Sequence, residues 1–475
     1  MSGLLANWFQ PREHQTTVRT EVLAGTTTFL TMAYIIFLQP AVLSGQLFGQ
    51  ETGMDFGAVT TATCVSAALA TLIMGAWARL PIALAPGMGE NFFFVLTAIP
   101  AAAALGYAEP WRAALGAVFV GGVLFFGLSL LGFRRRIMDA VSPSLKSGMA
   151  AGIGIFIAFL GLQNAGVILP DPGTGVKLNT QWLSPDRLVF GAGLLLTGGL
   201  LARRVRGAVL WGIIAAGLLA AGLRLAVPLL PESWQAAPLV AKSQLMTRFE
   251  WATGVVAPPP SVAPTFLKMD ILAALTLPML PLVLVFLFMD LFDTMGTLLG
   301  VSEQAGLMKN NELPHAREAL LADATGTVAG AMLGTSTVTS FIESAAGVQA
   351  GGRTGITALT TAGWFLVALF FSPVIAMVAS YPPITAPALV VVGALMMKSA
   401  TRIAWDDFTE ALPAFLIVIG IPFTVSVGDG LALGLVAYPV VKLLAGRRRD
   451  VSWLLYVLAV ALVLYFVLVR SRFGG

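Results

Sequence analysis

Apolar residues in this chain gather into long runs separated by short polar stretches, and this spacing predicts membrane-spanning segments. A helix needs about 20 mostly apolar residues to cross the hydrocarbon core of a bilayer. In the first half the runs cover residues 20–40, 57–78, 82–105, 112–133, 143–168, 187–202 and 206–228. In the second half they cover residues 270–299, 317–334, 335–350, 354–378, 383–399, 408–427 and 428–445. The pattern predicts an all-α membrane protein of about fourteen segments.

The runs divide into two sets of seven. We expect a first repeat at 1–228, a polar, proline-rich connecting region at 229–268, a second repeat at 269–446 and a C-terminal part at 447–475. Seven is an odd number, so the second set starts on the opposite side of the membrane and the repeats are inverted, an arrangement that recurs in transporters. The C-terminal part holds a further apolar segment, 451–469, which either spans or lies against the bundle.

Basic residues give the expected orientation. The clusters Arg134–Arg136, Arg203–Arg206 and Arg447–Arg449 all fall in loops on one side of this arrangement. Loops rich in Lys and Arg face the cytoplasm. We therefore expect a cytoplasmic N-terminus and an extracytoplasmic connecting region, with no cleavable signal peptide, because the first 20 residues are polar.

The amino-acid composition indicates that lipid surrounds most of the protein, and it argues against several classes of function. The chain is 57% hydrophobic and 11% charged, whereas a soluble domain has about 25% charged residues. The pI near 9.3 reflects the basic loops, so we expect no nucleic-acid partner. A single cysteine, Cys64, excludes an internal disulfide, and the two histidines, His14 and His315, lie in expected loops. No nucleotide-binding fingerprint is present, and we expect no cofactor and no metal.

The third segment of each half is interrupted by small and polar residues. The first contains Pro86-Gly-Met-Gly-Glu-Asn-Phe-Phe-Phe94, and the second contains Gly334-Thr-Ser-Thr-Val-Thr-Ser-Phe-Ile-Glu-Ser-Ala-Ala-Gly347. Irregular backbone at membrane depth is tolerated where protein or a cavity surrounds it. We expect both segments to be extended backbone followed by a half-helix, whose first N–H groups point into the membrane centre.

Carboxylates occur in these membrane segments. Asp290 and Asp293 belong to Met289-Asp-Leu-Phe-Asp-Thr-Met-Gly-Thr297, and Glu343 lies in the second interrupted segment. A charge inside a bilayer-length segment is costly and usually marks a substrate or ion path. A carboxylate accepts from N–H groups while backbone N–H groups donate, which suits a planar ligand such as a nucleobase. The alternatives are a structural ion pair or a cytoplasmic helix end.

Other residues near the interruptions have two interpretations each. Glu90 either faces the same cavity as Glu343 or caps its half-helix. Phe92, Phe93, Phe94 and Phe341 either stack on a planar ligand or pack the bundle. For Asp323, which precedes the second interruption, we expect a structural hydrogen-bonding role rather than contact with the ligand.

Together these motifs resemble the nucleobase:cation symporter-2 superfamily and, within it, the AzgA-like purine permeases. The matching stretches are Thr31-Met-Ala-Tyr-Ile-Ile-Phe37 with Pro40, Pro86-Gly-Met-Gly89 with Asn91, Asp290–Leu298, Gly334–Val348 and Gly351-Gly-Arg-Thr-Gly355. The resemblance implies core and gate domains, short antiparallel strands in the third and tenth segments, and elevator-like movement. It also implies proton-coupled uptake of adenine, guanine or hypoxanthine across the inner membrane by a homodimer.

The resemblance places Asp293 and Glu343 at the family's acidic substrate-binding positions. The full set of substrate-binding candidates is Asp293, Glu343, Glu90, Asn91, Phe92, Phe341, Ile342 and Thr31. The proton-coupling candidates are Glu343, Asp293, Asp290 and Glu90. Glu90, Phe92 and Gln39 depart from the family pattern, which leaves open xanthine, uracil or a cationic purine-like ligand. The remaining alternatives are an anion carrier of the same architecture, an intramembrane enzyme, or a receptor.

Overall fold

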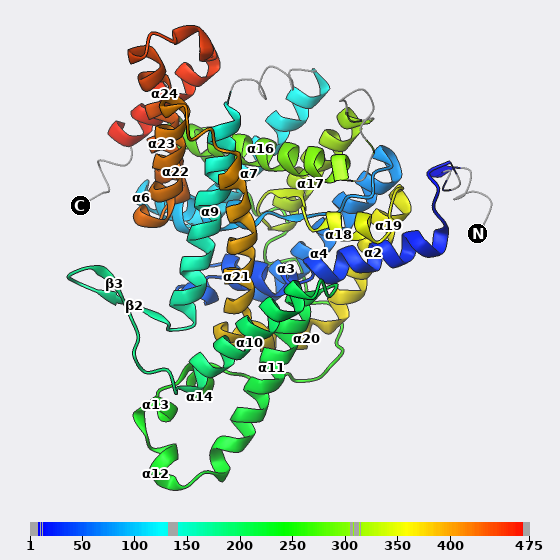
Figure 1. Cartoon of the computed structure of the whole chain (residues 1–475), viewed down its shortest axis with the longest axis vertical. Coiled ribbons are helices and arrows are strands. Elements are labelled where there is room, and N and C mark those ends of the chain that lie inside the picture. The colour runs from blue at the N-terminus through cyan, green and yellow to red at the C-terminus, as the bar shows by residue number, and fades with distance from the viewer. Residues whose placement is uncertain are drawn as a thin grey trace.

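The structure is a computed structural model that describes residues 8–9, 11, 13–131, 141–304, 307, 313 and 315–468 of the 475. The cluster Arg134–Arg136 lies outside the described residues. Figure 1 shows a helical bundle with small additions at its edges. By length and composition, nine helices within the described part of the chain could cross a membrane.

The first seven predicted segments correspond to consecutive elements. They are α2 (Val18–Met32) with α3 (Ile35–Leu43), α4 (Phe56–Ile73), β1 (Leu84–Pro86) with α5 (Met88–Phe93) and α6 (Ile99–Ala104), α7 (Pro110–Leu130), α9 (Pro143–Asn164), α10 (Pro185–Ala202) and α11 (Ala208–Ala226). Local sequence explains several starts. Pro110, Pro143 and Pro185 open their helices, where a missing N–H costs nothing. Ser142 caps α9 by accepting from Leu145 N at 3.2 Å.

The second set begins after the connecting region. Its elements are α16 (Leu280–Gln304), α17 (Ala316–Leu333), β4 (Val338–Ser340) with α18 (Ser344–Gln349), α19 (Gly355–Ala368) with α20 (Ser372–Ser380), α21 (Pro382–Met396), α22 (Phe408–Thr424) and α23 (Val427–Leu444). A last helix, α24 (Trp453–Leu468), covers most of the extra apolar segment.

Two features differ from the apolar pattern. The run predicted at 270–299 is divided into α15 (Ile271–Ala274) and α16, because Pro278 disfavours helical backbone in the residue before it. The loop after α9 contains a hairpin of β2 (Ile168–Asp171) and β3 (Gly175–Leu178). Its turn is held by Asp171, which accepts from Gly173 N at 2.9 Å and pairs with Lys177 at 3.0 Å.

The connecting region adds three short helices, α12 (Glu232–Gln235), α13 (Pro238–Ala241) and α14 (Gln244–Thr247). Asp186 at the start of α10 holds α14 by accepting from Gln244 N at 2.9 Å and Leu245 N at 3.0 Å. Tyr381, just before α21, donates to the same carboxylate at 2.7 Å. One buried carboxylate therefore joins the connecting region to both repeats.

The helices form two groups. The gate helices, α9, α10, α11, α21, α22 and α23, pack mainly on one another, as do the core helices, α2, α4, α7, α16, α17, α18 and α19. Figure 1 shows α9, α21, α22 and α23 standing together on one side and α2, α4, α18 and α19 on the other. Each group takes helices from both halves of the sequence, so each repeat contributes to both.

Candidate functional site

The two interrupted segments meet as a two-stranded antiparallel sheet. β1 pairs with β4 so that Leu84 lies opposite Ser340, Ala85 opposite Thr339 and Pro86 opposite Val338. Gly87 N donates to Thr337 O at 3.0 Å and Phe341 N donates to Ala83 O at 2.9 Å, which extends the pairing at both ends. Residues about 250 positions apart in the sequence are thus fixed to each other inside the core group.

Each strand is followed by a short helix, as the small and polar residues predicted. α5 starts after Gly87, and α18 starts after Glu343, which occupies its N-cap position. The strands give the buried backbone hydrogen-bond partners that a helix would otherwise supply. At the start of α18 the Glu343 carboxylate reaches Tyr34, which lies between α2 and α3.

Asp293 and Glu343 occur where this part of the core group is open. Asp293 is exposed, Glu343 and Thr31 are half-buried, and the Ile342 side chain is 52% exposed. The Tyr34 hydroxyl donates to Glu343 Oε1 at 2.6 Å, and the Thr31 hydroxyl lies 3.4 Å from the Glu343 carbonyl oxygen. Thr339 donates to Asp293 Oδ2 at 3.3 Å. The two carboxylates are close enough for their charges to interact.

Asp290 and Asp323 lie deeper, behind this opening. Asp290 accepts from the Thr327 hydroxyl at 2.8 Å, and Asp323 accepts from Ser340 at 3.2 Å. Both side chains are buried. Although Asp290 and Asp293 are three residues apart on α16, only Asp293 reaches the open side.

Glu90 and Asn91 are buried at the start of α5. The Glu90 carboxylate lies over Gly87, where a Cβ atom would collide with its Oε2, and its charge interacts with those of Asp293 and Asp290. This position next to the first turn fits the capping interpretation. Asn91 accepts from Ser336 in the second interrupted segment, and Gln39 donates to Thr335 at 2.7 Å. These amides join the repeats.

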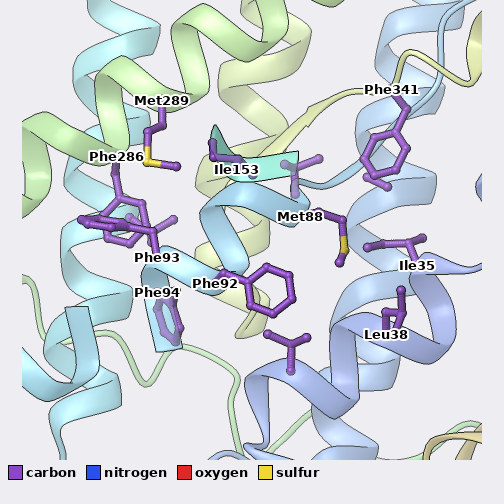
Figure 2. Close-up of a cluster of buried hydrophobic side chains, with 14 of the residues drawn as sticks. Ile35, Leu38, Met88, Phe92, Phe93, Phe94, Ile153, Phe286, Met289 and Phe341 are labelled. Carbon is purple, nitrogen blue, oxygen red and sulfur yellow. The ribbon is translucent and has the colours of Figure 1, made fainter. Parts of the chain in front are cut away.

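The phenylalanine side chains are packed. Phe92 makes edge contacts with Phe48 and with Phe156 of α9, at centroid distances of 6.0 and 5.9 Å. Phe93 lies against Phe286 of α16 at 4.7 Å, and Figure 2 shows its ring on the other side of the helix from that of Phe92. Phe341 is buried on the opposite side of this cluster. In this conformation Phe92 joins core to gate, and its stacking on a ligand stays a prediction.

The sequence did not single out three residues that contact candidate site residues. Tyr34, which contacts Glu343, lies in the quoted stretch Thr31–Phe37. Thr339, which contacts Asp293, and Ser336, which contacts Asn91, lie in the Gly334–Gly347 stretch. Their residue types signal hydrogen-bonding capacity, but contact with a particular carboxylate depends on which helices become neighbours.

A metal site and an apolar hollow are the alternatives to this opening. Within the described residues, no group of three or more His, Cys, Asp or Glu side chains could hold a metal ion. A hollow between α9, α16, α23 and α24 is lined only by apolar side chains, among them Met289 and Leu458. It contains none of the predicted polar residues, so the opening at Asp293 and Glu343 is the candidate site.

Comparison with known proteins shows which family this sequence belongs to. The model of the "Permease family" matches residues 19–433. A putative permease of Methanocaldococcus jannaschii is 47% identical over 461 residues, covering 97% of both chains. The guanine/hypoxanthine permease PbuG of Bacillus subtilis is 41% identical, covering 98% of this chain and all of that protein. The adenine permease AdeQ of Escherichia coli is 38% identical, covering 98% of this chain and 97% of that one.

A solved structure shows the same fold. The transmembrane domain of the cyanobacterial bicarbonate transporter BicA superposes with a TM-score of 0.57 at 15% identity, covering 88% of this chain and 97% of that domain. The predicted fold, a seven-plus-seven inverted repeat with core and gate domains, is therefore confirmed. The chain is a multi-pass membrane transporter, not an enzyme, and it belongs to the permease family, within the nucleobase:cation symporter-2 superfamily that its motifs resemble.

Proposed function

We propose that this chain takes up purine nucleobases, guanine, hypoxanthine or adenine, together with protons. The observation that carries the proposal is the convergence of Asp293 and Glu343 at the open side of the β1–β4 sheet. A purine presents N–H donors along its edge, which two carboxylates can accept. Relatives that match nearly the whole chain are named guanine/hypoxanthine and adenine permeases, which supports the same substrate class.

Proton coupling is proposed from the same residues. In the described part of the chain, neither Asp293 nor Glu343 forms an ion pair with a basic side chain. Two neighbouring carboxylates without a cation favour uptake of a proton by one of them. We propose that a proton enters with the base, neutralises the site, and allows the core helices to move past the gate helices. Of the four predicted proton-coupling candidates, we assign this proton to Glu343 or Asp293, which lie at the opening, rather than to the buried Asp290 and Glu90.

We also propose in which membrane, in which orientation and in which oligomeric state the chain works. We place it in the inner membrane with a cytoplasmic N-terminus and the region 229–268 outside, and we propose that two copies form a homodimer. The basic cluster Arg447–Arg449 then faces the cytoplasm, in agreement with the positive-inside rule.

The test is accumulation of radiolabelled guanine, hypoxanthine, adenine, xanthine and uracil in bacteria that lack their own nucleobase permeases, with and without a protonophore. We expect protonophore-sensitive uptake of one or more purines. Glu343→Gln and Asp293→Asn should each lower uptake about tenfold or more, because each removes a charged acceptor. Asp171→Asn, in the exposed hairpin, is the matched control and should transport normally.

Surface expression is measured in the same cells. Val255→Cys in a Cys64→Ala chain should react with a membrane-impermeant maleimide from outside, which also tests the proposed orientation. Full uptake by both Glu343→Ala and Asp293→Ala at normal expression would contradict the assigned site. Uptake of uracil or an anion instead of purines would contradict the proposed substrate class.

A further inference from the structure

Two carboxyl groups lie next to each other in the interior of the core group. Asp290 on α16 is 1% exposed and Asp323 on α17 is 0% exposed. Thr327, one helical turn after Asp323 on α17, donates to Asp290 Oδ2 at 2.8 Å, which brings α17 and Asp323 up to the Asp290 carboxyl group. Each has one oxygen that accepts from a hydroxyl, Asp290 Oδ2 from Thr327 and Asp323 Oδ1 from Ser340. The two remaining oxygens, Asp290 Oδ1 and Asp323 Oδ2, have no donor. Each of the two neighbouring carboxyl groups therefore has one buried oxygen that lacks a donor.

No positive charge replaces that donor among the described residues. None of the ion pairs there involves Asp290 or Asp323. The other titratable groups that act on the pair are Asp293 and Glu90, and both are acidic. Two adjacent ionised carboxylates without a cation are very unfavourable in a dry interior. One proton between the two oxygens would supply the missing donor and remove one of the charges.

We propose that Asp290 and Asp323 share one proton that stays with the folded protein during transport, and that this pair positions strand β4. The strand contacts the pair and its neighbours at all three residues. Val338 exchanges two bonds of 3.1 Å with the Thr327 hydroxyl, Thr339 pairs with Thr294 at 2.8 Å, and Ser340 donates to Asp323.

The pair thus acts on the site through β4. Thr339 extends from that strand to Asp293, and the turn after Ser340 leads to Glu343. A shift of β4 would displace Glu343 and the Thr339 hydroxyl that donates to Asp293, and would so change the surroundings of both carboxylates that we assign to the substrate. Asp290 and Asp323 are positioning residues in this inference, whereas the transported proton is carried by Asp293 or Glu343.

The test compares asparagine with leucine at each position. With one shared proton the pair has a single negative charge. Asp290→Asn or Asp323→Asn preserves that charge and supplies an amide N–H to the partner carboxylate. We expect both Asn variants to keep uptake within about twofold, with an unchanged pH profile, whereas Asp290→Leu and Asp323→Leu lose about tenfold or more through the unpaired partner. The uptake arm rests on the proposed function.

Infrared spectroscopy of the purified protein is independent of any substrate. We expect a protonated carboxylic acid band at pH 8 that either Asn substitution removes. Absence of that band, or Asn variants that no longer accumulate substrate or respond to pH, would overturn the shared, retained proton. Specific stabilisation by Na⁺ over choline that is lost in Asp290→Asn would overturn it in favour of a bound cation. If the band behaves as expected and purine uptake fails, only the proposed substrate is wrong.

Discussion

Single side chains near the site differ mainly in what surrounds them. Asp293 and Glu343 are partly open, Asp290 and Asp323 are buried against hydroxyls, and Glu90 lies over its own helix start. All five are acidic residues in apolar segments. The sequence alone marks Asp293, Glu343, Asp290 and Glu90 as functional candidates and favours a structural role for Asp323. Their different surroundings are the basis on which we propose two ligands, a positioning pair and a helix cap.

Tyr34 is a residue whose effect can be isolated. Its hydroxyl donates to Glu343 at 2.6 Å, and the residue is 2% exposed. Tyr34→Phe removes this donor with little change in shape, and a hydrogen bond to a charged group contributes about 1.5–3 kcal/mol. We expect KM for the purine to rise about tenfold or more, with little change in maximal rate. Concentration-dependent uptake measures both constants.

The control is Tyr107→Phe, whose hydroxyl pairs with Thr276 away from the site. It should transport with an unchanged KM. An unchanged KM in Tyr34→Phe as well would show that Tyr34 does not orient Glu343 for the substrate.

Elements in this protein begin and end for local reasons that the sequence displays. The polar interruptions at 86–94 and 334–347 become strand-then-helix units, and residues such as Ser142, Thr354 and Asp407 cap the helices that follow them. Pairing between β1 and β4 is not local, because it joins segments that are distant in the sequence. Caps are local, so each one can be tested in its own helix.

Asp407 gives a prediction about pH. It caps α22 by accepting from Thr409 N at 3.0 Å, and it pairs with Arg447 at 2.7 Å. Hydrogen bonds from Thr409 and from Arg447 lower the pKa of Asp407 to about 2, against an unfolded value of about 3.9. Its stabilising effect is therefore present above about pH 3.9 and is lost as the pH falls through about 2.

Asp407→Ala should lower the Tm, and the difference from the unsubstituted protein should be constant from pH 8 to about 5. Tryptophan fluorescence during heating of the detergent-solubilised protein measures it. Asp406→Ala, next to it and exposed, should have no such effect. A difference that changes near neutral pH would show that another group is responsible.

The whole molecule is organised as two bodies that each combine both repeats. Core helices contact mainly core helices, gate helices contact mainly gate helices, and Phe92 against Phe156 is one of the contacts between them. The proposed elevator movement requires these two bodies to slide. It follows that a covalent link between them should stop transport, whereas a link within one body should not.

The positions Leu30 and Gly207 allow this test, since a Cβ atom at Gly207 would lie 3.0 Å from Leu30 Cβ across the contact between α2 and α11. Gly207 has a left-handed backbone that strains a cysteine, so uptake by the reduced double variant is the baseline against which oxidation is measured. In a Cys64→Ala chain, oxidation of Leu30→Cys/Gly207→Cys should block uptake, and reduction should restore it. The control pair Gly148→Cys/Ala414→Cys joins two gate helices with 3.3 Å between Cβ positions. Its oxidation should leave uptake intact. Continued uptake by the oxidised first pair would contradict sliding of core past gate.

Much of this architecture can be predicted from the amino-acid sequence. Apolar length sets the segments, the odd number in each half sets the inverted repeat, and the Gly, Ser and Thr residues in two segments set the breaks, because bilayer thickness and backbone hydrogen bonding act locally. Asp293, Glu343 and Asp290 stand out for the same reason, since a carboxylate in an apolar run is conspicuous without any structure.

Tertiary structure alone decided which of these groups meet. The contacts of Tyr34 with Glu343 and of Ser336 with Asn91 join segments that are far apart in the sequence. The contact of Thr327 with Asp290, which brings Asp323 close, joins two separate helices. Phe92, one of the stacking candidates, packs against Phe156 of α9, and this contact depends on where the gate helices lie in the folded protein. Local patterns determine the helices and strands and which of their residues are polar. Which side chains become neighbours is decided only when both repeats fold together. The exposure of each carboxylate, the charges around it and its proposed role depend on those neighbours.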